Sequence, residues 1–140
     1  MESLIGLGKA GCNIVSLLKN HPVYNDFYID TGIKGTRHIC LPEYENTEDY
    51  DTNKASFKTN KSRIHNKVHF FMAGSGKISG ASLRMLEQIK KHDLNVCYIK
   101  SDPDAIGSVA SKRERVSFNV LQQFARSGLF DDLILVDNLS

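Results

Sequence analysis

The sequence predicts an α/β protein in which helices cover both faces of a doubly wound, mostly parallel sheet. Apolar runs of strand length alternate along the chain with segments that have helical spacing, an order typical of parallel sheets. Two of these runs lead directly into glycine-rich turns, at residues 6–11 and 74–80. The 140 residues, of which 41% are hydrophobic and 24% charged, suit one core, so we expect a single domain over 1–140.

The first unit is a strand that enters a G-x-G-x-x-G turn. A helical segment follows at 13–19, and a second strand at 26–30 ends in Asp30. Glycines at this spacing let backbone N–H groups approach an anion at the positive end of the helix. We therefore predict a site for a nucleotide phosphate at this turn. The alternative is a turn that only lets the helix pack closely on the sheet.

The segment after the second strand has no regular period. Short apolar groups at Ile33 and at 38–41 are candidate edge strands, and we interpret the polar stretch at about 42–66 as an irregular insertion. Insertions of this length inside a compact domain are typically functional or partner-facing. Its acidic first half and basic second half predict solvated loops, with an anion-binding or partner-binding surface as the alternative.

A second strand, turn and helix begin at the buried strand 68–73. The turn at 74–80 follows, and a helix is expected at 81–92 with these side chains on its buried face: Leu83, Met85, Leu86 and Ile89. Loops after parallel strands leave the sheet at the same edge. We therefore expect both glycine turns on one rim, where they can share a ligand.

The rest of the chain supplies two more strands, at 95–100 and 133–136, with a helix between them. A loop is expected at 107–111 and the helix at 112–126, which Gly128 closes. The apolar stripe expected to face the core is Val116, Val120, Leu121 and Phe124.

Composition excludes several classes of protein. A net charge of +2 is too small for a nucleic-acid-binding surface, and no apolar run is long enough to span a bilayer. We therefore expect no nucleic acid and no membrane as partners, and a cytoplasmic location. The three cysteines and five histidines show no metal-ligand or disulfide spacing, and no nucleophile or metalloprotease motif is present. We predict no catalytic residue and no metal site.

The order of turns and strands resembles the nucleotide-binding half of the tubulin and FtsZ superfamily, in a divergent form such as a phage or other viral tubulin-like protein. Residues 6–13 (GLGKAGCN) resemble the family's first loop, whose asparagine contacts guanine, and 74–80 (GSGKISG) lies where the family has its glycine-rich signature. Residues 112–115 (KRER) resemble its basic sugar-binding run, and 131–138 (DDLILVDN) its strand ending in asparagine. The resemblance implies a Rossmann-like fold of the tubulin and FtsZ type.

The chain also departs from the family pattern. Lys77 and Ile78 replace a threonine and a glycine of the signature, and the loop that meets the terminal phosphate has no counterpart in 31–67. Ile106 replaces the sugar-loop glutamate, and the family's central helix and C-terminal domain would lie beyond Ser140. Because phosphoryl transfer depends on positioning and charge stabilisation, GTP hydrolysis is expected to be slow or absent.

The resemblance implies a domain that binds a guanine nucleotide, or descends from one that did, and acts by assembling with itself or with other proteins. The implied cofactor is GTP or GDP with Mg²⁺, whereas a site that has lost its function would hold no nucleotide. A viral member of the family would work in the host cytoplasm or the virion. Two alternatives stay open: a nucleotide-free structural component of a larger assembly, for example a viral one, and an NAD-dependent Rossmann oxidoreductase that uses Asp30 for the ribose. The implied nucleotide contacts are Gly6, Gly8, Lys9, Gly11, Asn13, Gly74, Ser75, Gly76, Lys77, Ser79, Gly80, Arg113, Arg115 and Asn138.

Overall fold

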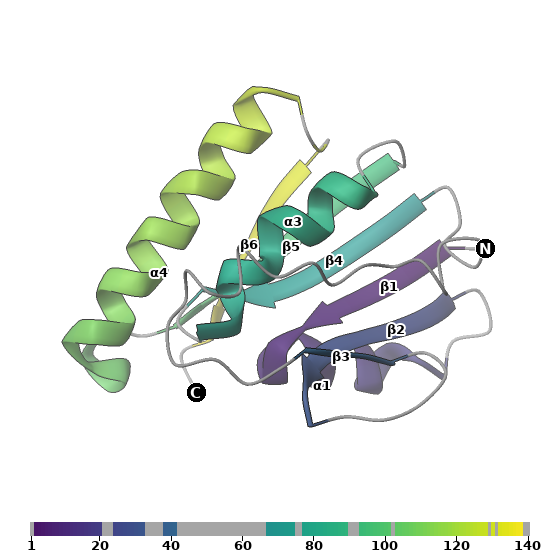
Figure 1. Ribbon diagram of the computed structural model, residues 1–140, viewed down its shortest axis with the longest axis horizontal. Helices are drawn as coiled ribbons and strands as arrows, with labels where there is room; N and C mark the ends of the chain where they lie inside the picture. The colour runs from purple at the N-terminus through teal and green to yellow at the C-terminus, as the bar shows by residue number, and fades with distance from the viewer. Residues whose placement is uncertain are drawn as a thin grey trace.

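The structure, a computed structural model, is an α/β fold (Figure 1). It describes residues 2–20, 24–32, 38–41, 67–74, 77–89, 93–101, 103–128, 130 and 132–138, and only the backbone at 77, 83, 84, 101, 103–106, 137 and 138. The elements, in chain order, are β1 (Glu2–Leu7), α1 (Gly8–Leu18), β2 (Tyr24–Thr31), β3 (His38–Leu41), β4 (Lys67–Ala73), the 3-10 helix η2 (Lys77–Ala81), α3 (Ser82–Gln88), β5 (Asp93–Ser101), α4 (Pro103–Arg126) and β6 (Asp132–Asn138).

The described strands pair in parallel in one six-stranded sheet, in the order β3-β2-β1-β4-β5-β6. The predicted α/β class and parallel sheet are therefore confirmed. The predicted edge strand at 38–41 is β3, and the predicted buried strand at 68–73 is β4, which lies between β1 and β5. The predictions for Ile33 and for 42–66 lie outside the described residues.

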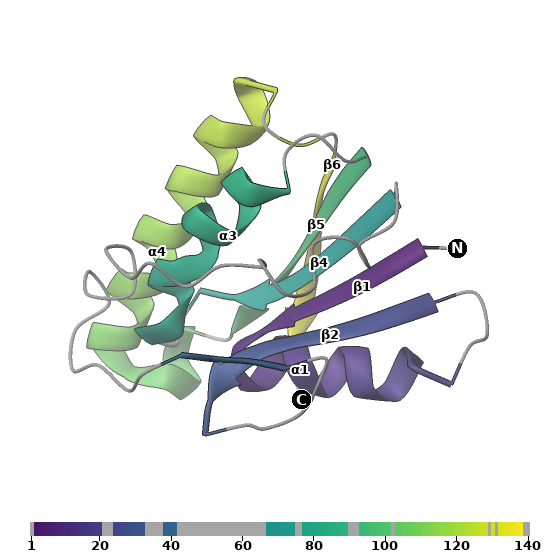
Figure 2. The ribbon, with the colours of Figure 1, turned by 45° about the vertical axis from the view of Figure 1, so that its right-hand side comes forward.

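Helices lie on both faces of the sheet (Figures 1 and 2). Helix α1 covers one face, where Val15 packs with Leu4 of β1 and Tyr28 of β2. Helices α3 and α4 lie on the opposite face over the larger core, which includes Phe70 of β4 and Tyr98 of β5. Because successive side chains of a strand point to opposite faces, the central strands bury apolar side chains on both sides.

Helix α1 begins at Gly8, directly after β1, and not at residue 13 as predicted. Its buried positions are Gly8, Gly11 and Val15, which share one helix face at spacings of three and four residues. Leu17, which belongs to the apolar spacing that predicted the helix, is 81% exposed. The prediction missed the start because two of the three contact positions are glycines, which carry no apolar signal.

Helix α3 is shorter than predicted. The expected turn at 74–80 ends in the 3-10 helix η2, and α3 itself ends at Gln88, where the backbone N–H of Ile89 donates to the carbonyl of Leu86 at 3.1 Å. Met85, Leu86 and Ile89 are buried as predicted. The side chain of Leu83 and residues 90–92 lie outside what the structure describes.

Helix α4 starts at Pro103, nine residues before the predicted start at 112, and is broken at Gly107, where φ is 82° and ψ is 172°. Leu121 is buried as predicted, but the inward face differs from the prediction at two positions: Glu114 is buried, and Val116 is 63% exposed. Gly128 closes the helix as predicted, with φ of 85° and its N–H donating to the carbonyl of Ala125 at 3.2 Å.

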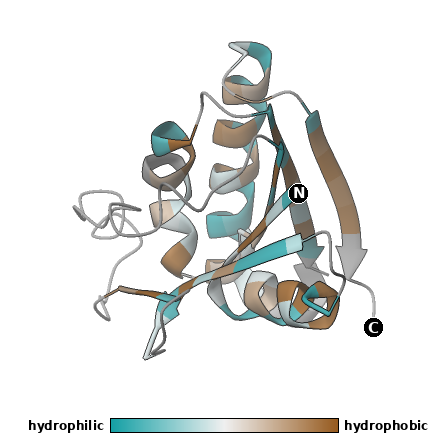
Figure 3. Ribbon diagram, turned by 90° about the vertical axis from the view of Figure 1, so that its right-hand side faces the viewer, coloured by the Kyte–Doolittle hydropathy of each residue, from teal (hydrophilic) through white to brown (hydrophobic). Residues whose placement is uncertain are grey.

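Strand β6 forms one edge of the sheet and is strongly apolar (Figure 3). Ile134, Leu135 and Val136 expose 49%, 50% and 41% of their surfaces. Because alternate residues of a strand face opposite ways, this exposed apolar surface lies on both faces of the edge strand.

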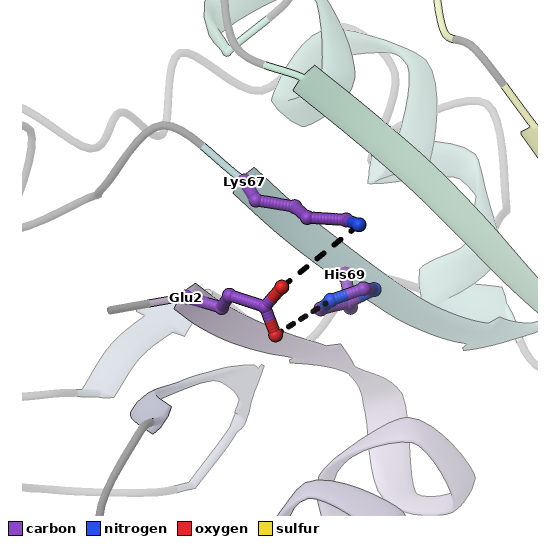
Figure 4. Close-up of polar contacts among 3 residues, drawn as sticks. All are labelled: Glu2, Lys67 and His69. Carbon is purple, nitrogen blue, oxygen red and sulfur yellow. Dashed lines mark hydrogen bonds and ion pairs between the residues drawn. The ribbon is translucent and has the colours of Figure 1, made fainter.

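At the N-terminal ends of β1 and β4, Glu2 of β1 contacts two basic side chains of β4 (Figure 4). Its carboxylate lies 3.9 Å from Lys67 Nζ and 3.4 Å from His69 Nε2. Glu2 is also the register partner of Lys67. The groups are partly exposed, so the contact mainly favours this register and adds little to stability.

Candidate functional site

The two glycine turns flank the point where the chain reverses its winding direction across the sheet. From β1 the chain proceeds to β2 and β3 on one side, and from β4 it proceeds to β5 and β6 on the other. Strands β1 and β4 are parallel neighbours, with Gly6 paired with Phe71. The turns that follow them therefore leave the sheet side by side, on the rim where they were predicted. In open parallel sheets, ligands bind in the crevice at this switch point.

The glycines of the first turn allow α1 to lie very close to the sheet. A Cβ atom on Gly11 would clash with the carbonyl oxygen of Phe71, and a Cβ on Gly6 would lie 2.6 Å from the carbonyl oxygen of Gly11. Gly8, the first residue of α1, has a φ of +73°, which other residues rarely adopt. Close packing, the alternative reading of the motif, therefore accounts for Gly6 and Gly11.

The start of α1 is chemically suited to an anion. Leu7 stands at the N-cap, where its hydrocarbon side chain accepts no hydrogen bond, and the first turn carries no acidic residue. The first N–H groups of a helix lack intrahelical partners and add to the positive end of its dipole. Lys9 in this turn is exposed and adds a positive charge. The arrangement favours a phosphate or carboxylate.

Asp30 lies near Cys12 of α1, as the effect of its charge on the Cys12 thiol indicates. Burial raises the pKa of the Cys12 thiol to about 11, and the negative charge of Asp30 contributes to the rise. The Cys12 sulfur lies 3.4 Å from the carbonyl oxygen of Gly6 and 3.7 Å from that of Ile29. The Asp30 carboxylate accepts the backbone N–H of Thr31 at 2.8 Å.

The second turn packs against β5 and contacts α4 through a pair of hydroxyl groups. The Ser79 hydroxyl donates to the carbonyl of Gly74 at 3.2 Å and lies 3.2 Å from the hydroxyl of Ser117 on α4. A Cβ on Gly74 would clash with the hydroxyl of Tyr98 and lie 3.0 Å from Ser117 Cβ. Ser79 is 2% exposed, so its hydroxyl faces the interior in this structure.

Ile78 occupies the space beside Gly8. A Cβ atom on Gly8 would lie 2.8 Å from Ile78 Cγ2. In dinucleotide-binding turns the second glycine lets the backbone approach the pyrophosphate. Here a methyl group from η2 lies where that approach would take place, at the position that departs from the family signature.

The remaining residues predicted to contact the nucleotide lie elsewhere in the structure or outside the residues that it describes. Asn13 is exposed on α1, Arg113 is half-buried and Arg115 exposed on α4, and Gly80 is half-buried in η2. Ser75 and Gly76 lie outside the described residues, as do the side chains of Lys77 and Asn138. The structure thus brings the first turn next to Ile78, and it places Arg115 at a separate cavity.

That cavity, of about 410 Å³, lies between β5 and α4. It is lined by Tyr98, Lys100, Ser111, Glu114, Arg115 and Phe118. The helical spacing of the last four residues was a usable signal. It was missed because 107–111 was expected to be a loop and Val116 was expected to face inward.

Comparisons with known proteins identify no family. No protein-family model matches the chain, and no curated protein matches it. Within the described residues no helix is long and apolar enough to cross a membrane. Among those same residues, no three His, Cys, Asp or Glu side chains gather as a metal site would require. The likeness to the tubulin and FtsZ superfamily stays a prediction from motifs.

Proposed function

We propose that this chain is a nucleotide-binding domain of the tubulin and FtsZ type that holds nucleotide phosphates at the switch point of its sheet. It then acts by assembling with copies of itself or with other proteins. The observation that supports the phosphate site best is the uncapped, acid-free start of α1, beside the turn after β4.

The backbone N–H groups at the start of α1 would hold the phosphate, with Lys9 adding charge. The preference for guanine rests on the resemblance alone, through Asn13. Mg²⁺ would arrive with the nucleotide. For the phosphate to approach Gly8, the half-buried side chain of Ile78 has to turn aside. We expect binding with little or no hydrolysis.

Thermal unfolding with GTP, GDP, ATP or NADH, each with Mg²⁺, tests this function. At a ligand concentration about 100 times the dissociation constant, one-site binding stabilises the fold by about 2.7 kcal/mol. We expect stabilisation by GTP and GDP and none by ATP or NADH. Stabilisation by NADH alone would favour the oxidoreductase alternative, in which Asp30 holds the ribose. No stabilisation by any ligand would refute nucleotide binding.

A second candidate function is a nucleotide-free structural component of a larger assembly. The contact between Ile78 and Gly8 favours it, because the glycine then makes room for a side chain of the same protein. The buried, hydrogen-bonded Ser79 is also consistent with a purely structural turn.

Ile78→Gly, which restores the family's glycine, separates the two candidates, with Ile78→Val as the conservative control. If the site binds nucleotide, GTP should stabilise the glycine variant at least as much as the wild type. If the site is structural, the glycine variant should melt at a lower temperature than the wild type and gain nothing from GTP.

A further inference from the structure

The cavity between β5 and α4 is formed by one face of each element. Tyr98 and Lys100 are two residues apart on β5 and therefore point to the same side of the sheet. The α4 residues that line it share one helix face, at spacings of three, four and seven: Ser111, Glu114, Arg115 and Phe118. Its volume of about 410 Å³ falls in the range of small-molecule sites, roughly 300–1,000 Å³.

Two aromatic rings form a fixed apolar wall of this cavity. The rings of Tyr98 and Phe118 lie 5.4 Å apart at an angle of 48°. The Tyr98 hydroxyl donates to the backbone carbonyl of Glu114 at 3.3 Å, which holds the ring in place. Tyr98 is fully buried and Phe118 is half-buried, so Phe118 is the ring that a flat apolar group can reach, and Tyr98 holds that ring in place from behind.

Two cations stand at the same cavity. Lys100 and Arg115 are exposed, and neither has an ion-pair partner among the residues that the structure describes. Together with the buried Glu114, they give the described lining residues a formal charge of +1, from two cations and one carboxylate. Cations beside an apolar wall suit an anionic group attached to an apolar body.

We propose that this cavity is a second binding site, for a small organic anion with a flat aromatic body. The aromatic body would pack on Phe118, whose ring is backed by the buried Tyr98, and Lys100 and Arg115 would bind the anionic group. Tyr98 separates this site from the glycine turns, because its ring lines the cavity while its hydroxyl lies against Gly74. The proposal does not depend on nucleotide binding.

Naphthalene-1-sulfonate is a suitable probe, and neutral naphthalene-1-sulfonamide is its uncharged counterpart. Binding is measured by calorimetry, and the site is located from NMR shifts of the Tyr98 and Phe118 ring signals. We expect both ring signals to move, and the sulfonate to bind at least about tenfold more tightly than the sulfonamide.

The double variant Lys100→Met and Arg115→Met should weaken sulfonate binding at least about tenfold and leave sulfonamide binding nearly unchanged. The matched control, Lys112→Met and Arg126→Met, removes two exposed cations of α4 that do not line the cavity. It should keep the wild-type affinity. The single Lys100→Met and Arg115→Met variants, each expected to lose part of the affinity, replace the double variant if it does not fold.

The proposal would be overturned by unmoved Tyr98 and Phe118 signals, by equal binding of the two probes, or by equal losses in the two double variants. Competition between GTP and the sulfonate would also overturn it, by making the cavity part of the nucleotide site. If GTP fails to bind while the sulfonate binds as described, only the proposed nucleotide function is refuted.

Discussion

At the scale of single residues, Gly11 sets how closely α1 approaches the sheet. A Cβ there would meet the backbone carbonyl of Phe71, which cannot rotate away. We predict that Gly11→Ala lowers the free energy of unfolding by about 3 kcal/mol. Gly128→Ala, where a positive φ is the only obstacle and nothing lies within 4 Å, should cost about 1 kcal/mol. Urea unfolding measures both, and equal losses would contradict the packing argument.

The raised pKa of the Cys12 thiol predicts that the folded state loses stability at alkaline pH. Its pKa is about 11 in the folded protein, against an ordinary thiol value of 9.0, so between these pH values the unfolded chain loses its thiol proton first. The folded state then binds more protons, and the free energy of unfolding falls as pH rises from about 9 to about 11. Burial also raises the pKa of Cys97, which contributes with the same sign.

The Cys12→Ala variant isolates this effect. Urea unfolding at intervals from pH 8 to pH 11 should show a shallower decline for the variant than for the wild type, because one of the titrating thiols is gone. Parallel pH profiles would contradict the prediction, because they would show that the Cys12 thiol has the same pKa in the folded and the unfolded state.

At the scale of elements, the second turn is coupled to α4 through the hydroxyls of Ser79 and Ser117, which lie 3.2 Å apart. We predict a coupling free energy of about 1 kcal/mol in the double-mutant cycle of Ser79→Ala and Ser117→Ala. Ser127→Ala, which removes an exposed 2.8 Å bond to the Phe124 carbonyl, should cost only a few tenths. Strictly additive losses for Ser79 and Ser117 would contradict the coupling.

The sequence predicted the strands better than the helices. A run such as 68–73, buried on both faces, leaves a continuous apolar signal that needs no knowledge of its neighbours. The start of α1 was missed because glycine is a poor helix former, and here close packing against β4 outweighs that preference. The face of α4 was misread because Glu114 is buried where the pattern favoured Val116.

At the scale of the whole molecule, the rim shared by both glycine turns followed from parallel strands alone. The contact of Ile78 with Gly8 and the cavity at Arg115 did not, because both depend on how η2 and α4 pack against distant strands. Pattern rules describe single elements, and these features arise between elements that are far apart in the sequence.

The sheet also ends in an apolar edge strand, which predicts a tendency to aggregate. Edge strands with exposed apolar side chains pair readily with other chains. We predict that Ile134→Lys raises the temperature at which light scattering begins during slow heating. Val109→Lys changes charge equally at a helical site that is 70% exposed, and it should have a smaller effect. Equal effects would assign the change to charge rather than to β6.

The most direct test of phosphate binding at the switch point is an amide ¹H–¹⁵N NMR titration with GDP and Mg²⁺. We predict that the largest shift changes occur at the first amides of α1, Gly8 to Gly11, with a saturable dependence on GDP. We expect little change along β6, at the far edge of the sheet. Unchanged amides at the start of α1, with GDP at millimolar concentration, would contradict phosphate binding at the switch point.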